Sequence, residues 1–171
     1  MSVLSACVQM IDAFTDRCGQ ILIWLSLAMA IVTAYVVIIR YGFNSGSILA
    51  QEAVTYLHGS LFLLGAAYAL KMGAHVRVDI FYRSFQPRTR AWIDSLGGIV
   101  FLLPLCVFIV LSSWGYVTES WSMRETSPEP GGIPAVFLLK TLIPVGAILL
   151  AIQGVAEILR NALLLVEGRP D

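Results

Sequence analysis

Four long stretches of apolar residues constrain this chain more than any other feature of its sequence. They cover residues 21–39, 53–70, 95–117 and 133–156, and they hold no acidic side chain and only two basic ones, His58 and Lys140. A helix needs about 20 apolar residues to cross a hydrocarbon core of about 30 Å. We therefore predict an all-α integral membrane protein whose four transmembrane helices form a single domain over residues 1–171.

The composition supports the same class of protein. Hydrophobic residues make up 58% of the chain and charged residues only 13%, which is more apolar than a soluble domain. The formal net charge is zero, so the charge gives no reason to expect a nucleic-acid partner.

Basic residues are distributed unequally between the segments that connect the four stretches. Three of them fall on the side of the loops that follow the first and third stretches, namely Arg40, Arg124 and Lys140. Eight fall on the opposite side: Arg17, Lys71, Arg77, Arg83, Arg88, Arg90, Arg160 and Arg169. Because cytoplasmic segments carry the excess of Lys and Arg, both termini are predicted to be cytoplasmic.

Two segments outside the apolar stretches are predicted to form amphipathic helices at the membrane surface. Near the N-terminus, apolar residues recur at helical spacing, at Leu4, Val8, Ile11 and Phe14. Before the third stretch, Pro87 is suited to the first turn of a helix. The first apolar stretch is too long for a removable signal peptide, so we expect it to be retained.

Catalysis and cofactor binding are not expected from this chain. His58 and His75 are separated by 17 residues, about 25 Å along a continuous helix, which is too far for a shared haem. No cluster of His, Cys and carboxylate residues has metal-ligand spacing, and no nucleotide-binding or hydrolase motif occurs. The prediction is a protein that is not an enzyme and has no catalytic, cofactor or metal residues.

Polar residues near the ends of the spans are the remaining candidates for a structural role. Glu52 and Lys140 either form an ion pair, or Lys140 reaches the outer headgroups while Glu52 is solvated. His58 is interpreted as a hydrogen-bonded interior or interface residue. The pair Gly65 and Ala69 allows close helix packing, either within this chain or on a separate subunit.

The loop after the second span contains alternating polar residues, His75, Arg77 and Asp79. We interpret them as a polar clamp that fixes the turn from the second span into the helix at Pro87. The alternative is a solvated loop without such a role.

Four short motifs occur in order along the chain and together resemble one family. They are Arg40-Tyr41-x-Phe43-Asn44, Gln51-Glu52, Leu64-Gly65-Ala66-Ala67-x-Ala69, and His75-Val76-Arg77-Val78-Asp79-Ile80-Phe81. With four spans of this length, the chain resembles the small membrane subunit of tripartite ATP-independent periplasmic (TRAP) transporters. Many members have two glutamates in place of Gln51-Glu52 and a tryptophan at the position that matches Ser60.

The resemblance implies a transporter subunit in the bacterial inner membrane. Its partners would be the lipid bilayer, a large permease subunit, which carries the substrate and sodium sites, and a periplasmic solute-binding protein. The small subunit would serve as a scaffold in ion-gradient-driven uptake of an organic acid. The candidates for a subunit contact or a structural role are Arg40, Asn44, Glu52, Gly65, Ala69, His75, Arg77, Asp79 and Lys140. Three acidic residues of the outer loop, Glu119, Glu125 and Glu129, are candidates for docking the binding protein.

Two other kinds of protein were considered. A small four-helix multidrug exporter needs a carboxylate within the membrane, and these spans contain none away from their ends. A membrane anchor of a redox enzyme would bind its cofactor jointly with a partner chain.

Overall fold

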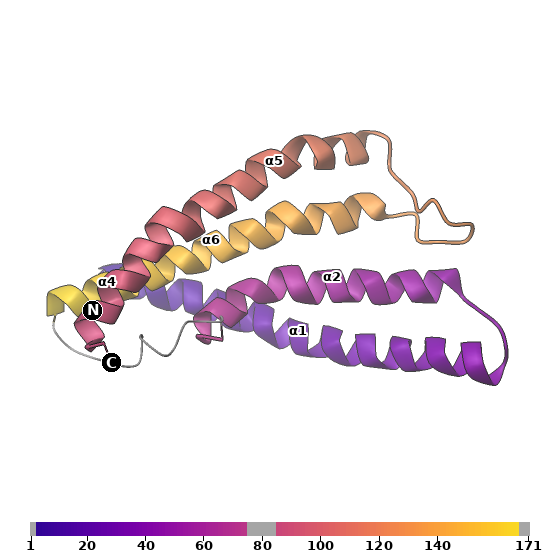
Figure 1. The fold of residues 1–171 in the computed structure, drawn as a ribbon, viewed down its shortest axis with the longest axis horizontal. Helices are drawn as coiled ribbons and strands as arrows, with labels where there is room; N and C mark the ends of the chain where they lie inside the picture. The colour runs from indigo at the N-terminus through magenta and orange to yellow at the C-terminus, as the bar shows by residue number, and fades with distance from the viewer. Residues whose placement is uncertain (1–2, 75–84, 168–171) are drawn as a thin grey trace.

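The computed structural model describes residues 3–74 and 85–167 of the 171-residue chain. Within these ranges the chain is helical except for its connecting segments (Figure 1). The elements in order are α1 (Val3–Gly42), α2 (Ile48–Lys71), α4 (Pro87–Gly97), the π-helical turn η1 (Gly98–Leu102), α5 (Leu103–Ser122) and α6 (Val136–Glu167).

The prediction of four transmembrane helices is confirmed. Four helical runs in the described residues are long and apolar enough to span a membrane, the third being the continuous run of α4, η1 and α5. Each predicted span lies in one of these runs, although α6 begins at Val136, three residues later than expected. Residues 3–20, for which we expected a short surface helix, are helical but continue without a break into the 40-residue α1.

The four spans lie in a row and do not form a closed bundle. On the side of the connections 43–47 and 123–135, the order in Figure 1 is α5, α6, α2 and α1, and the most extensive helix contacts are α5 with α6, α6 with α2, and α2 with α1. α1 also contacts α6, whereas in the described residues α5 has no comparable contact with α1 or α2. The described residues therefore leave two broad faces of the row uncovered.

Small residues set the distance between neighbouring helices. At Gly146 of α6, a Cβ atom would lie 2.7 Å from the backbone oxygen of Leu63 in α2, so the two backbones are almost in contact. At Gly19 of α1, a Cβ atom would lie 2.5 Å from the ring of Tyr68 in α2. Glycine at these positions allows the close approach that van der Waals packing between membrane helices needs.

Proline determines the local form of the third run. Pro87 occupies the first turn of α4, as predicted, because the missing N–H is not needed there. Pro104 is the second residue of α5, just after η1, and it cannot donate to the carbonyl four residues earlier. A single π turn, in which the Leu103 N–H donates to the carbonyl of Gly98, accommodates this change of hydrogen bonding.

The two ends of the row differ in structure. We call the end with the connections 43–47 and 123–135 the hairpin end, and the end with the start of α1 and the end of α6 the terminal end (Figure 1). At the hairpin end, Asn44 adopts a left-handed conformation with φ of 54°, which asparagine tolerates better than most residues. Ser47 then caps α2 by accepting a hydrogen bond from the N–H of Ala50.

Candidate functional site

Glu52, in the first turns of α2, holds the long loop of the hairpin end. Its carboxylate accepts hydrogen bonds from the hydroxyl of Ser127 and, at 2.6 Å, from the backbone N–H of Ile133. A Cβ atom at Gly132 would collide with Ser127 and with the Glu52 carboxylate, so glycine is required beside this contact. The loop 123–135 is irregular in its backbone, yet Glu52 connects both of its halves to α2.

Lys140 forms an ion pair with Glu125 of the same loop, and not with Glu52. The Lys140 ammonium also lies over the ring of Tyr116, 3.9 Å from its centroid, in a cation–π contact. Glu125 accepts a further hydrogen bond of 2.6 Å from the hydroxyl of Ser120. The direct pair that we considered for Glu52 and Lys140 is therefore wrong, because each of them binds a different residue of loop 123–135.

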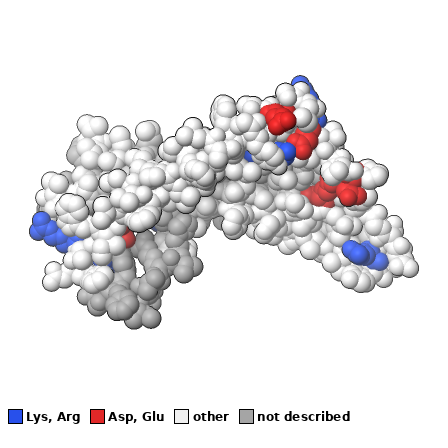
Figure 2. Space-filling view, turned by 45° about the horizontal axis from the view of Figure 1, so that its top comes forward, with Lys and Arg blue, Asp and Glu red and all other residues white. Residues whose placement is uncertain are grey.

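Acidic side chains are grouped at the hairpin end on the face shown in Figure 2, with basic side chains beside them. Of the three docking candidates, Glu119 and Glu129 are exposed, whereas Glu125 is partly enclosed by its contacts with Lys140 and Ser120. Glu125 thus has a role within the chain, and only the other two present their carboxylates freely to solvent.

The contacts of Glu125 make the hairpin end sensitive to acid. Hydrogen bonding from Lys140, then from Ser120, lowers the pKa of Glu125 below its ordinary value of 4.5. A carboxylate with a lowered pKa in the folded state stabilises the fold above its ordinary pKa, and this contribution is lost as the pH falls through the lowered value. We expect the melting temperature of Glu125→Gln to be below that of the parent protein at neutral pH, and the difference to shrink below pH 4.5.

Differential scanning fluorimetry of the detergent-solubilised protein between neutral pH and about pH 3 measures this difference. The matched control is Glu129→Gln, which removes an exposed carboxylate of the same loop. A melting difference for Glu125→Gln that stays constant down to the lowest pH would contradict the assignment.

A second polar cluster lies at the terminal end, and sequence reasoning missed it. Its centre is Gln153 of α6, which is completely buried, with an exposed fraction of 0%. The side chain of Gln153 accepts a hydrogen bond of 2.7 Å from Thr15 and donates bonds of 3.1 Å to Asp12 and 3.2 Å to Glu157. These bonds connect the first turns of α1 to the second half of α6.

Ion pairs surround this buried amide. Arg160 bridges the carboxylates of Asp12 and Glu157, at 2.6 Å to each. Lys71, at the end of α2, pairs with Asp16 at 2.5 Å and donates to the backbone oxygen of Asp12. We call the seven residues the terminal polar network: Asp12, Thr15, Asp16, Lys71, Gln153, Glu157 and Arg160.

A sequence signal for this network exists in each helix separately. Asp12, Thr15 and Asp16 follow helical i, i+3, i+4 spacing, and Gln153, Glu157 and Arg160 follow i, i+4, i+7 spacing. Each set therefore lies along one face of its helix. Spacing does not show that the two faces meet, because Asp12 and Arg160 are 148 residues apart.

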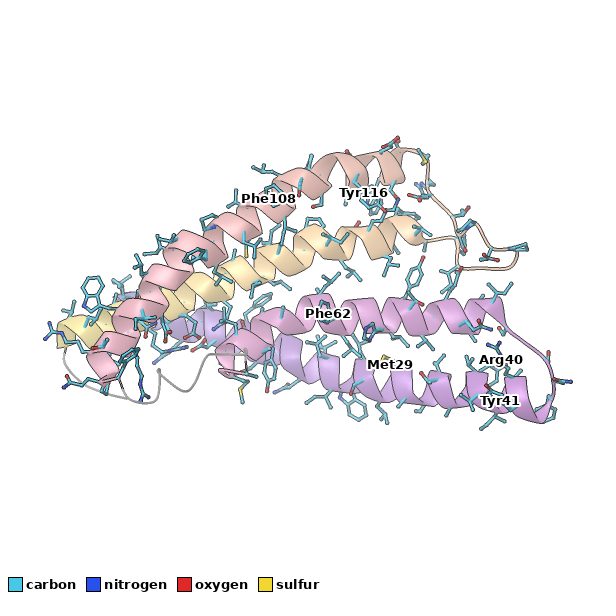
Figure 3. The ribbon with its side chains drawn as sticks, in the orientation of Figure 1. Met29, Arg40, Tyr41, Phe62, Phe108 and Tyr116 are labelled. Carbon is cyan, nitrogen blue, oxygen red and sulfur yellow. The ribbon has the colours of Figure 1, made fainter. Side chains whose placement is uncertain are left out.

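The remaining candidates fall into three groups. Arg40 and Asn44 line a polar hollow at the hairpin end together with Gln51, and Figure 3 shows Arg40 and Tyr41 at that end of α1. Gly65 of α2 faces Leu22 of α1, and Ala69, which is also on α2, is half-buried. His75, Arg77 and Asp79 lie outside the described residues.

His58 lies on the exposed face of α2, where its ring stacks on that of Phe62 with centroids 6.4 Å apart. It makes no hydrogen bond to another described residue, in contrast to the interior alternative considered for it. Among the described residues, no group of three His, Cys, Asp or Glu side chains is placed to hold a metal ion.

Comparison with known proteins adds a family match. The model of the family described as tripartite ATP-independent periplasmic transporters, DctQ component, matches residues 29–164. The chain is 28% identical over 126 residues to a C4-dicarboxylate TRAP transporter small permease protein from Vibrio cholerae, covering 70% of this chain and 54% of that protein. It is 30% identical over 102 residues to a protein named as a TRAP transporter small permease from Haemophilus influenzae, covering 59% of this chain and 63% of that protein. The matched region thus spans between half and two thirds of the length of these relatives.

Proposed function

Because the chain belongs to the DctQ component family of the tripartite ATP-independent periplasmic transporters, we propose that it supports a large membrane subunit during ion-driven uptake. The resemblance predicted from the sequence motifs is confirmed by this membership. The chain is a small permease subunit of the inner membrane. The family is one of transporter subunits and not of enzymes, and it replaces the exporter and the redox anchor considered above.

The observation that carries the proposal is an open row of helices fixed at both ends. At the hairpin end, Glu52 and Lys140 bind loop 123–135. At the terminal end, the terminal polar network connects α1, α2 and α6. Fixed ends keep the helices in constant relation, while the open faces offer apolar area for another membrane protein. This combination suits a stationary support better than a part that moves substrate.

The proposed orientation places the terminal end in the cytoplasm and the hairpin end in the periplasm. In the sequence, eight of the eleven Lys and Arg residues lie on the side of the two termini, and cytoplasmic segments carry the excess of these residues. The hairpin end would then face a periplasmic solute-binding protein. The proposed solute is an organic acid, in keeping with the C4-dicarboxylate named for the Vibrio cholerae relative, and its selection is assigned to the other two components. Sodium coupling is assigned to the large subunit.

Co-expression with the large permease and the binding protein of the same transporter tests the support role. We expect the large permease to be purified with this chain, and uptake of the organic acid by proteoliposomes to require both. Purification of each membrane protein alone, or equal uptake without this chain, would contradict the proposal.

Docking at the hairpin end has its own test. Neutralising both exposed acids, with Glu119→Gln and Glu129→Gln, is expected to slow association of the binding protein, because charges at the rim of an interface act mainly on the association rate. The effect should be largest at low ionic strength. Neutralising Arg124 in the same loop is expected to act in the opposite direction. Unchanged association rates and uptake in the double variant would contradict docking through these residues.

A further inference from the structure

The exposed side of α2 carries a line of polar side chains that make no hydrogen bond to another described residue. Gln51, Thr55 and His58 are all exposed and recur at i, i+4 and i+7. At 100° per residue they fall within about 60° of one another around the helix, so they form one line, which we call the polar stripe. Phe62, with an exposed fraction of 73%, continues the same line.

The polar stripe runs from the membrane boundary into the hydrocarbon core. α2 begins at Ile48, so Gln51 lies about 4.5 Å and His58 about 15 Å along the helix axis from that start. With the predicted span beginning at residue 53, His58 lies about 7.5 Å inside the hydrocarbon core, more than one helical turn from its boundary. Polar groups at that depth need hydrogen-bond partners, because lipid tails offer none.

Other exposed hydroxyl groups of the spans behave differently from Thr55. Thr33 and Thr118 donate to backbone oxygens one turn earlier in their own helices, at 2.7 and 2.9 Å. Ser26 and Ser112 do the same. These hydroxyls are satisfied without a partner molecule. By contrast, the side chains of Gln51, Thr55 and His58 make no hydrogen bond to any described residue.

The positively charged side chain of Arg40 lies beside the hairpin end of the polar stripe. Gln51 and Arg40 line the same polar hollow, together with Asn44. Arg40 is exposed, and within the described residues no carboxylate pairs with it. The surface therefore offers a guanidinium near the membrane boundary and hydrogen-bonding groups about 4.5 to 15 Å along α2, that is, at increasing depth.

These features exclude two possible occupants. A parallel twofold dimer of this chain through α2 would place the two Arg40 side chains at the same depth, where like charges repel. Lipid headgroups offer acceptors to Arg40, but they lie at the boundary and not at the depth of His58. A transmembrane helix from a different chain meets both requirements.

We propose that the polar stripe is the face on which a transmembrane helix of the large permease packs, with a carboxylate opposite Arg40 and hydrogen-bonding side chains opposite Thr55 and His58. The proposal rests on the proposed function and adds the location of the contact. It assigns to Gln51, Thr55 and His58 the formation of interhelical hydrogen bonds, and to Phe62 an apolar contact next to them.

Site-specific cross-linking tests the location. A photoreactive amino acid at position 58, in the chain co-expressed with the large permease, is expected to form an adduct with the mass of both proteins. The comparison position is 111 on α5, where Leu111 has an exposed fraction of 71% and α6 separates its helix from α2. Adducts at position 58 with a second copy of this chain, or with lipid alone, overturn the proposal.

Substitution tests the chemistry. The double variant Thr55→Val and His58→Leu is expected to weaken co-purification of the large permease by about tenfold, at roughly threefold per lost interhelical hydrogen bond. Its thermal stability as an isolated chain should be unchanged, since neither side chain hydrogen-bonds to a described residue. The control is Thr33→Val with Thr118→Val, which should leave co-purification unchanged.

The two proposals fail in different ways. If the unaltered chain does not co-purify with the large permease, the proposed function itself is wrong. If the unaltered chain co-purifies but the Thr55 and His58 substitutions leave the yield of complex unchanged, the support role stands and the polar stripe is not the contact.

Discussion

Replacing Gly146 by alanine is expected to force α6 away from α2 and to destabilise the protein by about 1 to 3 kcal/mol. The added Cβ atom would lie 2.7 Å from the backbone oxygen of Leu63 and 3.1 Å from its carbonyl carbon. Backbone atoms cannot rotate aside as a side chain can, so the two helices must separate. The higher helix propensity of alanine, up to about 1 kcal/mol, offsets only part of this cost.

Gly115→Ala is the matched control for this substitution. Gly115 is also a glycine within a span, but a Cβ atom there would meet no atom within 4 Å. We expect its stability to equal or exceed that of the parent protein. Thermal unfolding in detergent, followed by loss of helical circular dichroism, compares the two variants. Equal stability of Gly146→Ala and Gly115→Ala would show that the close approach of α2 and α6 does not contribute.

Replacing Gln153 by leucine is expected to destabilise the terminal end by about 2 to 4 kcal/mol, because each buried polar group left without its partner costs about 1 to 3 kcal/mol. The substitution removes the acceptor of the Thr15 hydroxyl, which is only 4% exposed, and a donor to Asp12. Gln153 is itself completely buried, so no water replaces the lost bonds at its position.

A second substitution separates hydrogen bonding from side-chain shape. Adding Thr15→Val to Gln153→Leu removes the hydroxyl that the first change leaves unsatisfied, so the double variant should recover part of the lost stability. Gln20→Leu, at an exposed position of α1, is the control for the change of residue type and should have little effect. The network would have no stabilising role if Gln153→Leu and Gln20→Leu unfolded alike.

Much of the fold could be predicted from local sequence patterns. Hydropathy located the four spans because the membrane imposes the same length and polarity on each of them separately. Pro87 at the start of α4 was predictable for a similar reason, since the constraint of its ring acts within one turn. The row of helices was not predictable, because the apolar surface of a span is similar whether it contacts lipid or another helix.

The candidate site shows the same division. The charges of Glu52 and Lys140 stood out in the sequence, and both do hold the hairpin end together, but through Ser127, Ile133 and Glu125 and not through each other. An ion pair depends on where a loop returns in space, and residue spacing does not contain that information. The polar stripe on α2 was not predicted from the sequence, because only the structure showed which face of α2 the described residues leave uncovered.

The sequence by itself determined the class of protein, the number of spans and, through its motifs, the family. These properties follow from hydropathy and short-range spacing, which act within one helix or one turn. The tertiary structure decided the order of the helices in the row and the partners of the polar residues. It brought Asp12 to Arg160 across 148 residues and left His58 exposed. The physical reason is that burial and pairing depend on contacts between distant segments, which are established only when all four helices pack together.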